Sequence, residues 1–228
     1  MDTVSNHFPI VFRLATAADR EDVRDALGRF FYPDEPVTSS YYGGSEVTAD
    51  DMHFTLSMID DGFVILAVDK KNGKIVGLSI GGIIEPDEPE KLLDLASKVD
   101  TVKFADILLF LAHMAKGANI CQRFTVAKAY HIHCLAVAPE VRGRSLGKLL
   151  MKKQFEQAEK CGVEVVSTDA TGLYSAQLFK QLGMTCVYSV PYNEYRNESQ
   201  QQVFAGRESH LEAKTFTMAI GHLASMNE

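Results

Sequence analysis

The chain has 228 residues, a formal net charge of −7, and hydrophobic and charged contents of 46% and 23%. These values suit one soluble globular domain, and the acidic balance argues against nucleic acid as the main partner, because phosphate binding needs a basic face. The longest apolar run, Ile107 to Ala112, is too short to span a bilayer, and Met1 to Asn6 shows no secretory signal, so we expect a cytoplasmic monomer that does not use a membrane.

The four cysteines follow no metal-binding or redox pattern. They form neither a Cys-x-x-Cys pair nor a His/Cys cluster with zinc spacing; they are Cys121, Cys134, Cys161 and Cys186. We interpret them as free thiols of a reducing compartment and expect no metal. A cysteine nucleophile is the remote alternative.

The first half of the chain predicts two strands joined by a hairpin, preceded by a strand and two helices. Thr16 and Asp19 have the spacing of a capping box, and Pro33 and Pro36 stop the helix that follows. The turn at Lys71-Asn-Gly73 signals the hairpin. The expected elements are a strand at 9–14, a helix from 16 to about 31, a helix from 48, and strands at 62–68 and 75–84.

The second half alternates helices and strands. Phe104, Ile107, Leu108 and Leu111 recur at helical spacing, which is more often a core face than a binding groove. The expected elements are helices at 89–98, 101–115, 146–162 and 174–182, and strands at 130–137, 164–167, 185–190 and 215–220. Interspersed helices and mixed strands predict one α/β domain over 1–228, with a core from about 9 to 221.

The most informative stretch is the turn between the strand at 130–137 and the next helix. It reads Arg142, Gly143, Arg144, Ser145, Leu146, Gly147. The first-turn N–H groups of a helix are unpaired and its dipole is positive there, while arginines suit phosphate oxygens, so the turn predicts a phosphorylated ligand. The spacing matches neither the Walker pattern nor the three-glycine dinucleotide pattern.

Arg142-x-x-Ser145-x-Gly147 resembles the pyrophosphate loop Gln/Arg-x-x-Gly-x-Gly/Ala of the GNAT superfamily of N-acetyltransferases, with Ser145 in place of the first glycine. Leu178-Phe-Lys-Gln-Leu-Gly183 resembles the helix of that superfamily that follows the next strand. The resemblance implies a single-domain GNAT fold with a central mixed, mostly antiparallel sheet flanked by helices. It also implies acetyl-CoA as co-substrate, with pyrophosphate on the turn and the thioester carbonyl polarised by the backbone of Leu135, Ala136 and Val137.

Two segments resemble the arylalkylamine N-acetyltransferases. Phe30 to Pro36 is similar to a segment of the insect enzymes, which implies that Glu35 is the general base. Late in the chain, His210 resembles a histidine of the same branch, so we expect Pro36 and His210 to border the amine. His131-x-His133 is similar to a histidine pair of the vertebrate enzymes, and residues two apart on a strand share a face.

The proton acceptor stays open between Glu35 and the histidine pair. An alkylamine has a pKa of about 10 and arrives as an ammonium; a carboxylate can hold that cation, whereas a free histidine, at about 6.5, is better matched as a base. Glu35 could equally be an exposed loop carboxylate, and His131 and His133 a satisfied polar patch.

The departing thiolate lacks its usual partner. Many enzymes of the superfamily place a tyrosine at the position of Phe179, which has no proton to donate. Thr171 and Ser175 stand where the insect branch has serines, so the resemblance implies hydroxyl roles for them. Tyr41 and Tyr42 could form an aromatic wall for the amine or pack as ordinary loop aromatics.

Three functions are compatible with these residues. The first is acetyl transfer to a small arylalkylamine such as dopamine, tyramine or serotonin, by direct attack in a ternary complex. The second keeps the fold and takes a polyamine, an agmatine-like amine or a protein amine. The third is a non-catalytic module that binds acyl-CoA.

Overall fold

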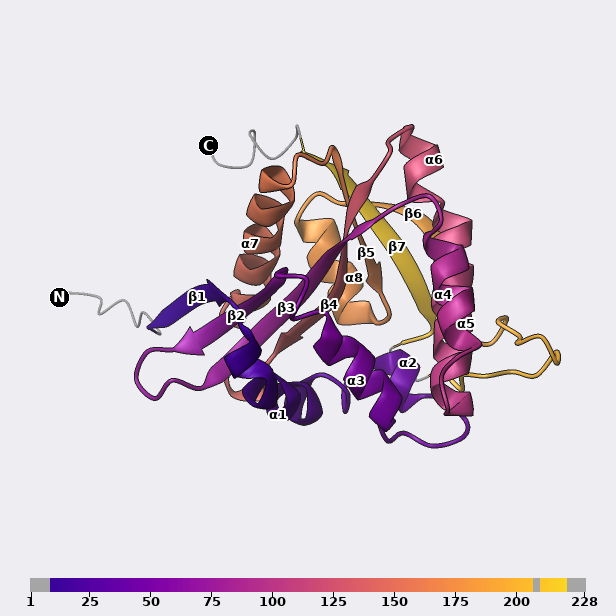
Figure 1. Ribbon diagram of the computed structural model, residues 1–228, viewed down its shortest axis with the longest axis horizontal. Helices are drawn as coiled ribbons and strands as arrows, with labels where there is room; N and C mark the ends of the chain where they lie inside the picture. Colours follow the sequence, from indigo (N-terminus) through magenta and orange to yellow (C-terminus); the bar gives the residue numbers. More distant parts are fainter. Residues whose placement is uncertain (1–8, 207–209, 221–228) are drawn as a thin grey trace.

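The structure, a computed structural model, describes residues 9–206 and 210–220 (Figure 1). Within these residues the centre is a seven-stranded sheet of order β1-β2-β3-β4-β5-β7-β6. Only β4 and β5 pair in parallel. The strands are β1 (Ile10–Leu14), β2 (Val64–Asp69), β3 (Ile75–Ile84), β4 (Ala129–Val137), β5 (Val165–Ala170), β6 (Thr185–Pro191) and β7 (Glu212–Ala219). The predicted single α/β domain with a mostly antiparallel mixed sheet is confirmed.

Helices cover both faces of this sheet. They are α1 (Arg20–Phe30), α2 (Pro36–Ser39), α3 (Ala49–Ser57), α4 (Glu88–Ala96), α5 (Val102–Ala118), α6 (Ile120–Phe124), α7 (Leu146–Lys160) and α8 (Leu173–Gln181), with 3-10 turns at Ala17–Asp19 and Pro139–Val141. Phe216 of β7 shares a core cluster with α7 and α8, whereas Ala213 shares one with α5. Residues 213 and 216 point to opposite faces, so α7 and α8 lie on one side and α5 on the other.

The structure departs from the sequence prediction at four elements, one of which is β7, which begins at Glu212 instead of residue 215. Pro36 begins the short helix α2 instead of continuing a loop, because the side chain of Glu35 caps it. Helix α6 was not expected. Strand β5 continues to Ala170 instead of ending at Ser167, since it keeps its pairing with β7 over that length.

Helices α5 and α6 together form a stretch, Val102–Phe124, with the length and apolar composition of a membrane-crossing helix and a mean hydropathy of 1.3. Half of its most apolar window is buried inside the protein. Core helices of soluble proteins share these properties, and α5 packs against α4 and β6. We therefore interpret the stretch as part of the core.

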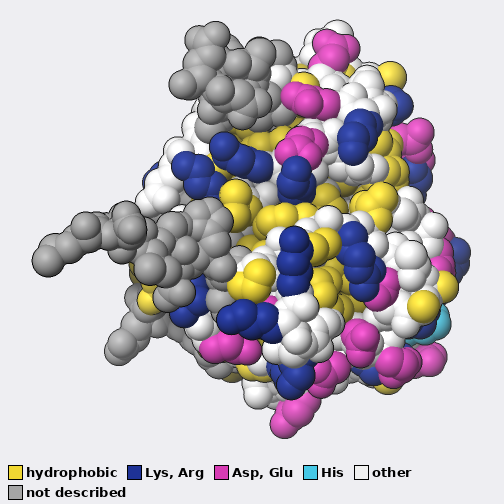
Figure 2. All heavy atoms as spheres, turned by 90° about the vertical axis from the view of Figure 1, so that its left-hand side faces the viewer, with side chains coloured by type: hydrophobic (Ala, Val, Ile, Leu, Met, Phe, Trp, Pro, Cys, Tyr) yellow, Lys and Arg dark blue, Asp and Glu magenta, His cyan; other side chains and the backbone are white. Residues whose placement is uncertain are grey.

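The surface on the side of β1 and α7 carries charges of both signs. Figure 2 shows Lys and Arg side chains there, interspersed with Asp and Glu and with hydrophobic side chains between them. The acidic net charge is therefore not concentrated on this face.

Candidate active site

Strand β4 contains a bulge at the histidine pair. Ile80 of β3 pairs with Cys134, and the next residue, Gly81, pairs with Ile132, so His133 has no partner in β3. Gly81 is required here because a Cβ would come within 2.3 Å of the Tyr130 hydroxyl. A bulge adds a residue to one strand and redirects its side chains, which are often functional.

Strands β4 and β5 separate immediately after the bulge. Their pairing covers only Tyr130 to Ile132 opposite Val166 to Thr168. Beyond Ile132, no strand of the described residues pairs with the edge of β4 that faces β5, and this edge includes Leu135, Ala136 and Val137. An open strand edge offers backbone donors and acceptors to an extended ligand.

The predicted phosphate turn lies at the end of this open edge. Gly143 and Ser145 both have a positive φ, 75° and 61°, and α7 begins at Leu146. A serine in this left-handed conformation carries a cost of about 1 kcal/mol, and glycine avoids it. A Cβ on Gly147 would meet Leu178 at 3.4 Å and Val137 at 3.8 Å, so the first turn of α7 faces the gap between the strands.

The two arginines of the turn have different surroundings. Arg142 donates from Nε to the carbonyl of Val137 at 2.9 Å and from a terminal nitrogen to Asp34 at 2.6 Å. Asp34 directly precedes Glu35, so this ion pair ties the phosphate turn to the Glu35 segment. Arg144 lies on the exposed side of the turn.

Glu35 is the N-cap of α2. Its two carboxylate oxygens accept from the backbone N–H of Val37, at 3.0 Å, and of Thr38, at 2.5 Å. Pro36 occupies the first position of the helix, where a missing N–H costs nothing. From the sequence we expect the prolines to stiffen this segment. In the structure the Glu35 carboxylate also fixes it, by capping α2.

Segments far apart in the sequence meet at Gly172. A Cβ there would come within 2.6 Å of His210 Nδ1 and 3.2 Å of Pro36 Cγ, so only glycine fits between them. His210 Nδ1 accepts the backbone N–H of Leu173 at 3.1 Å, which leaves the ring proton on Nε2. Pro36 and His210, predicted near the amine, thus lie together.

The candidate hydroxyls flank the same turn. Ser175 donates to the carbonyl of Gly172 at 3.0 Å, and the carbonyl of Thr171 accepts the Tyr192 hydroxyl at 2.7 Å. Tyr174 is exposed, at 72%, and contacts the His210 ring edge-on. Phe179 is buried and packs against Phe216.

The two predicted loop tyrosines differ. Tyr41 donates to Asp106 of α5 at 2.9 Å, and burial raises its pKa to about 12. Lys103 lies over its ring and donates to the carbonyls of Thr38 and Gly44. Tyr42 is 62% exposed. Tyr41 therefore anchors the segment after α2 to α5.

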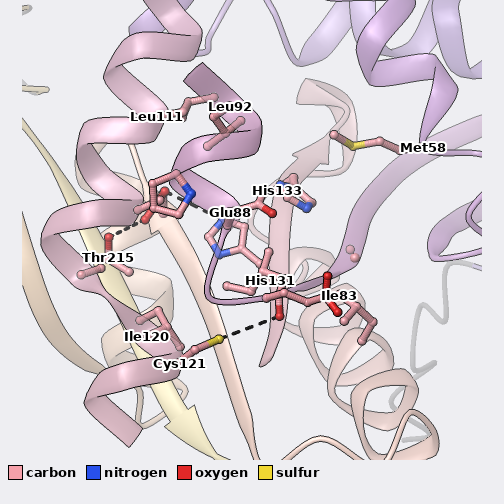
Figure 3. Close-up of a pocket in the computed structure, with 18 of the residues that line it drawn as sticks. Met58, Ile83, Glu88, Leu92, Leu111, Ile120, Cys121, His131, His133 and Thr215 are labelled. Atoms are coloured by element: carbon pink, nitrogen blue, oxygen red, sulfur yellow. Dashed lines mark hydrogen bonds and ion pairs between the residues drawn. The ribbon is translucent and has the colours of Figure 1, made fainter. Parts of the chain in front are cut away.

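A cavity of about 480 Å³ has the histidine pair in its lining. Figure 3 shows His131 and His133 at its centre, with Leu92 and Leu111 on one side and Ile120 and Cys121 on the other. Its carboxylates are Asp61, Glu85, Glu88 and Asp169, and no Lys or Arg lines it among the described residues. This composition favours an apolar ligand that carries positive charge.

The polar end of the cavity is a hydrogen-bonded group. His131 Nδ1 bonds to the Ser167 hydroxyl at 2.9 Å, and its Nε2 lies 3.9 Å from Asp169, which accepts from Thr215 at 2.6 Å. Burial lowers the pKa of His131 to about 4 and raises that of Asp169 to about 6. His133 stays accessible to water, yet its place among cavity walls also lowers its pKa.

Sequence reasoning named the two histidines but missed Asp169 and Thr215. The available signal was the spacing of Ser167 and Asp169, because residues two apart on a strand share a face. Within residues 9–206 and 210–220, no three His, Cys, Asp or Glu side chains are placed to hold a metal ion.

Comparison with known proteins gives consistent results. The Acetyltransferase (GNAT) family matches residues 21–184. A mosquito arylalkylamine N-acetyltransferase like 5b is 38% identical, with a TM-score of 0.90, over 92% of this chain and 99% of that one. A Drosophila melanogaster polyamine N-acetyltransferase that forms N-acetylagmatine is 31% identical (TM-score 0.86), and arylalkylamine N-acetyltransferase 2 from Aedes aegypti is 27% identical (0.83), each with the same coverage.

Proposed function

Because this chain belongs to the GNAT family of acetyltransferases, we propose that it transfers the acetyl group of acetyl-CoA to the primary amine of a small arylalkylamine of the dopamine, tyramine or serotonin type. One observation carries the proposal: Pro36, which follows the capping residue Glu35, meets the Gly172 turn and His210. These residues match the amine side of the insect enzymes that the sequence resembles.

The residues present fit acetyl-CoA. The first-turn N–H groups of α7, together with Arg142 and Arg144, suit a pyrophosphate, and Gly147 leaves space for close approach. The open edge of β4 at Leu135 to Val137 offers backbone groups to an extended chain and to a carbonyl. When bound, acetyl-CoA supplies an acetyl group already activated as a thioester, so the protein has to bind, orient and move protons.

We assign to Glu35 the binding and deprotonation of the amine. Its carboxylate holds the incoming ammonium and takes one proton, directly or through a water, which frees the nitrogen lone pair for attack. Two acceptor positions of the carboxylate are used by Val37 and Thr38, and the remaining positions are available to a cation. A positioned base of this kind contributes about 10²- to 10⁴-fold. Thr171 and Ser175 are assigned to the leaving thiolate through their hydroxyls, since Phe179 has none.

A second candidate substrate is a polyamine or an agmatine-like amine. The cavity that His131 and His133 line has four carboxylates and no Lys or Arg among its described lining residues, which favours a ligand with a second positive charge. A turnover panel of tyramine, dopamine, serotonin, agmatine and spermidine separates the two candidates. A kcat/KM for agmatine or spermidine at least tenfold above that for each arylalkylamine would select the second.

Glu35→Gln tests the catalytic assignment. The amide keeps an oxygen for the helix cap but loses the charge and the proton-accepting group, so we expect kcat to fall about 100-fold or more. Acetyl-CoA affinity, measured by calorimetry, should change less than twofold. Thr48→Ala is the matched control, because Thr48 caps α3 in the same way and lies outside the site. Nearly full turnover in Glu35→Gln would reject Glu35, and a wild-type protein that binds no acetyl-CoA would reject the function.

A further inference from the structure

The registers of three strands place four polar side chains on one face of the sheet. His131 of β4 pairs with Ser167 of β5, and Asp169 of β5 pairs with Thr215 of β7. Cross-strand partners point to the same side, and Ser167 and Asp169 are two apart on one strand. The four side chains therefore form one row across three strands, and three of them line the cavity.

Asp169 is a half-buried carboxylate with few partners among the described residues. Its side chain is 16% exposed, and within the described part of the chain its only hydrogen bond comes from Thr215. Its second oxygen lies 3.9 Å from His131 Nε2, which is beyond hydrogen-bond distance. The remaining acceptor positions of this carboxylate can bind a hydrogen-bond donor or a cation.

Asp169 also stands at the point where β4 and β5 separate. The last paired residues are Ile132 and Thr168, so Asp169 is the first residue of β5 beyond the parallel pairing. The bulge residue His133 occupies the corresponding place on β4. The gap between these strands is where the proposed function puts the reacting carbonyl.

The two histidines are not equivalent as proton acceptors. His131 uses Nδ1 with Ser167 and directs Nε2 toward Asp169, so it presents neither nitrogen to the cavity. The ring of His133 makes no hydrogen bond to any described residue, and it contacts His131 edge-on at 4.8 Å. His133 and Asp169 therefore both keep acceptor positions. Burial lowers the pKa of His133 to about 3 and raises that of Asp169 to about 6, so the carboxylate is the stronger base of the two.

We propose that Asp169 is a second proton-accepting site for the amine, which binds a primary alkylammonium in the cavity and is positioned by the hydrogen bond from Thr215. This inference rests on the proposed N-acetyltransferase function. Glu35 takes the first proton, before the attack, and Asp169 takes the second. After the C–N bond has formed, an N–H bond of the positively charged nitrogen breaks and an O–H bond forms at Asp169 Oδ2, while the electron pair stays on nitrogen. The cationic nitrogen and the carboxylate become a neutral nitrogen and a neutral acid, so charge and atoms balance.

The surroundings favour this transfer. Burial raises the pKa of Asp169 to about 6, closer to that of an amine than an ordinary carboxylate. The ionisable groups that face the cavity with it are His131, His133, Cys121, Asp61, Glu85 and Glu88. Lys91 pairs with Glu85 but does not line the cavity. No described lining cation therefore competes with the ammonium for Asp169.

The test is the pH dependence of kcat/KM, with the best amine of the panel, in five proteins: the wild type, Glu35→Gln and the three variants below. Asp169→Asn keeps an oxygen for Thr215 but cannot accept the proton, so we expect a loss of about 100-fold and the disappearance of an acidic limb near pH 6. Thr215→Val removes the donor that stabilises the ionised carboxylate, which should move that limb to higher pH. Thr217→Val is the control, because Thr217 is buried on the same strand and does not line the cavity.

Each outcome decides between alternatives. The proposal is overturned if Asp169→Asn keeps the acidic limb of the wild-type pH profile and a kcat within threefold of wild type. It is also overturned if Glu35→Gln loses that limb and Asp169→Asn keeps it. Should Asp169→Asn fail to fold, the Thr215→Val profile decides alone, and an unshifted limb rejects Asp169. Acetyl-CoA binding by calorimetry is measured in every variant; a wild-type protein that binds or turns over nothing refutes the underlying function instead.

Discussion

At the scale of single residues, we expect Gly147 to lower the stability of α7 and to favour acetyl-CoA binding. A glycine inside a helix weakens it, and alanine is better by about 1 kcal/mol. The Cβ of an alanine would make only ordinary contacts, 3.4 Å from Leu178 and 3.8 Å from Val137, but it would point into the gap assigned to acetyl-CoA. Packing alone therefore does not require a glycine here, which agrees with the proposal that acetyl-CoA approaches this turn.

Gly147→Ala should consequently weaken acetyl-CoA binding about tenfold or more while the melting temperature stays the same or rises. Calorimetry and thermal unfolding measure the two effects. Gly28→Ala is the control, since Gly28 lies inside α1 with open space around it and should gain stability without any change in binding. A Gly147→Ala protein that binds acetyl-CoA as tightly as wild type would remove the phosphate turn from the site.

At the scale of elements, α8 is held to the sheet by a residue that the superfamily pattern assigns to catalysis. Phe179 is 1% exposed and packs edge-on against Phe216 of β7. Its burial, and the absence of a hydroxyl, make packing its physical role. The turn that precedes α8 carries Thr171 and Gly172, so the position of this helix also sets the position of the site.

Phe179→Ala should lower the free energy of unfolding by about 3–5 kcal/mol, the usual cost of removing a buried phenyl ring. The pH profile of the remaining activity should keep its shape, because no titrating group is lost. Tyr174→Ala, on the exposed side of the same helix, provides the comparison and should leave stability almost unchanged. An unchanged melting temperature with a shifted basic limb would contradict the packing role.

At the scale of the whole molecule, buried titratable groups link stability to pH. The pKa of Asp169 is about 6 in the folded protein, above the value of about 3.9 in an unfolded chain. Between these values the folded state binds more protons, so this group makes the protein less stable as the pH rises through the window. His131, whose pKa is lowered to about 4, acts in the opposite direction between about pH 4 and 6.5.

Asp169→Asn removes only the first of these two contributions. We expect the variant to be more stable than wild type at pH 7.5, by roughly 1–2 kcal/mol after allowance for partial exposure, and to match it near pH 4. Thermal unfolding at the two pH values measures this. If the variant is less stable than wild type at pH 7.5, the ionised carboxylate stabilises the fold. Burial of Asp169 would then not lower the free energy of unfolding.

Hydrophobic periodicity, together with glycines, prolines and capping residues, was enough to predict the sheet, most helices and the tight turn at residues 142–147. Arg142 to Gly147 lie next to one another in the chain, and the turn that they form depends on adjacent residues alone. Strand β3 occupies the predicted residues, and α1 follows the predicted capping box. Such features need no knowledge of distant segments, because hydrogen bonds between near neighbours and hydrophobic period decide them.

The candidate site depended on the tertiary structure. The contact of Pro36 with Gly172, and the bond between Thr215 and Asp169, join residues far apart in the chain. The bulge at His133 is a property of the pairing between β3 and β4 and has no signal in either strand alone. Periodicity states which face of a strand a side chain occupies, whereas register and packing choose its partner. The sequence by itself therefore determined the family and the tight turn at residues 142–147, and only the folded chain decided which polar groups share the cavity.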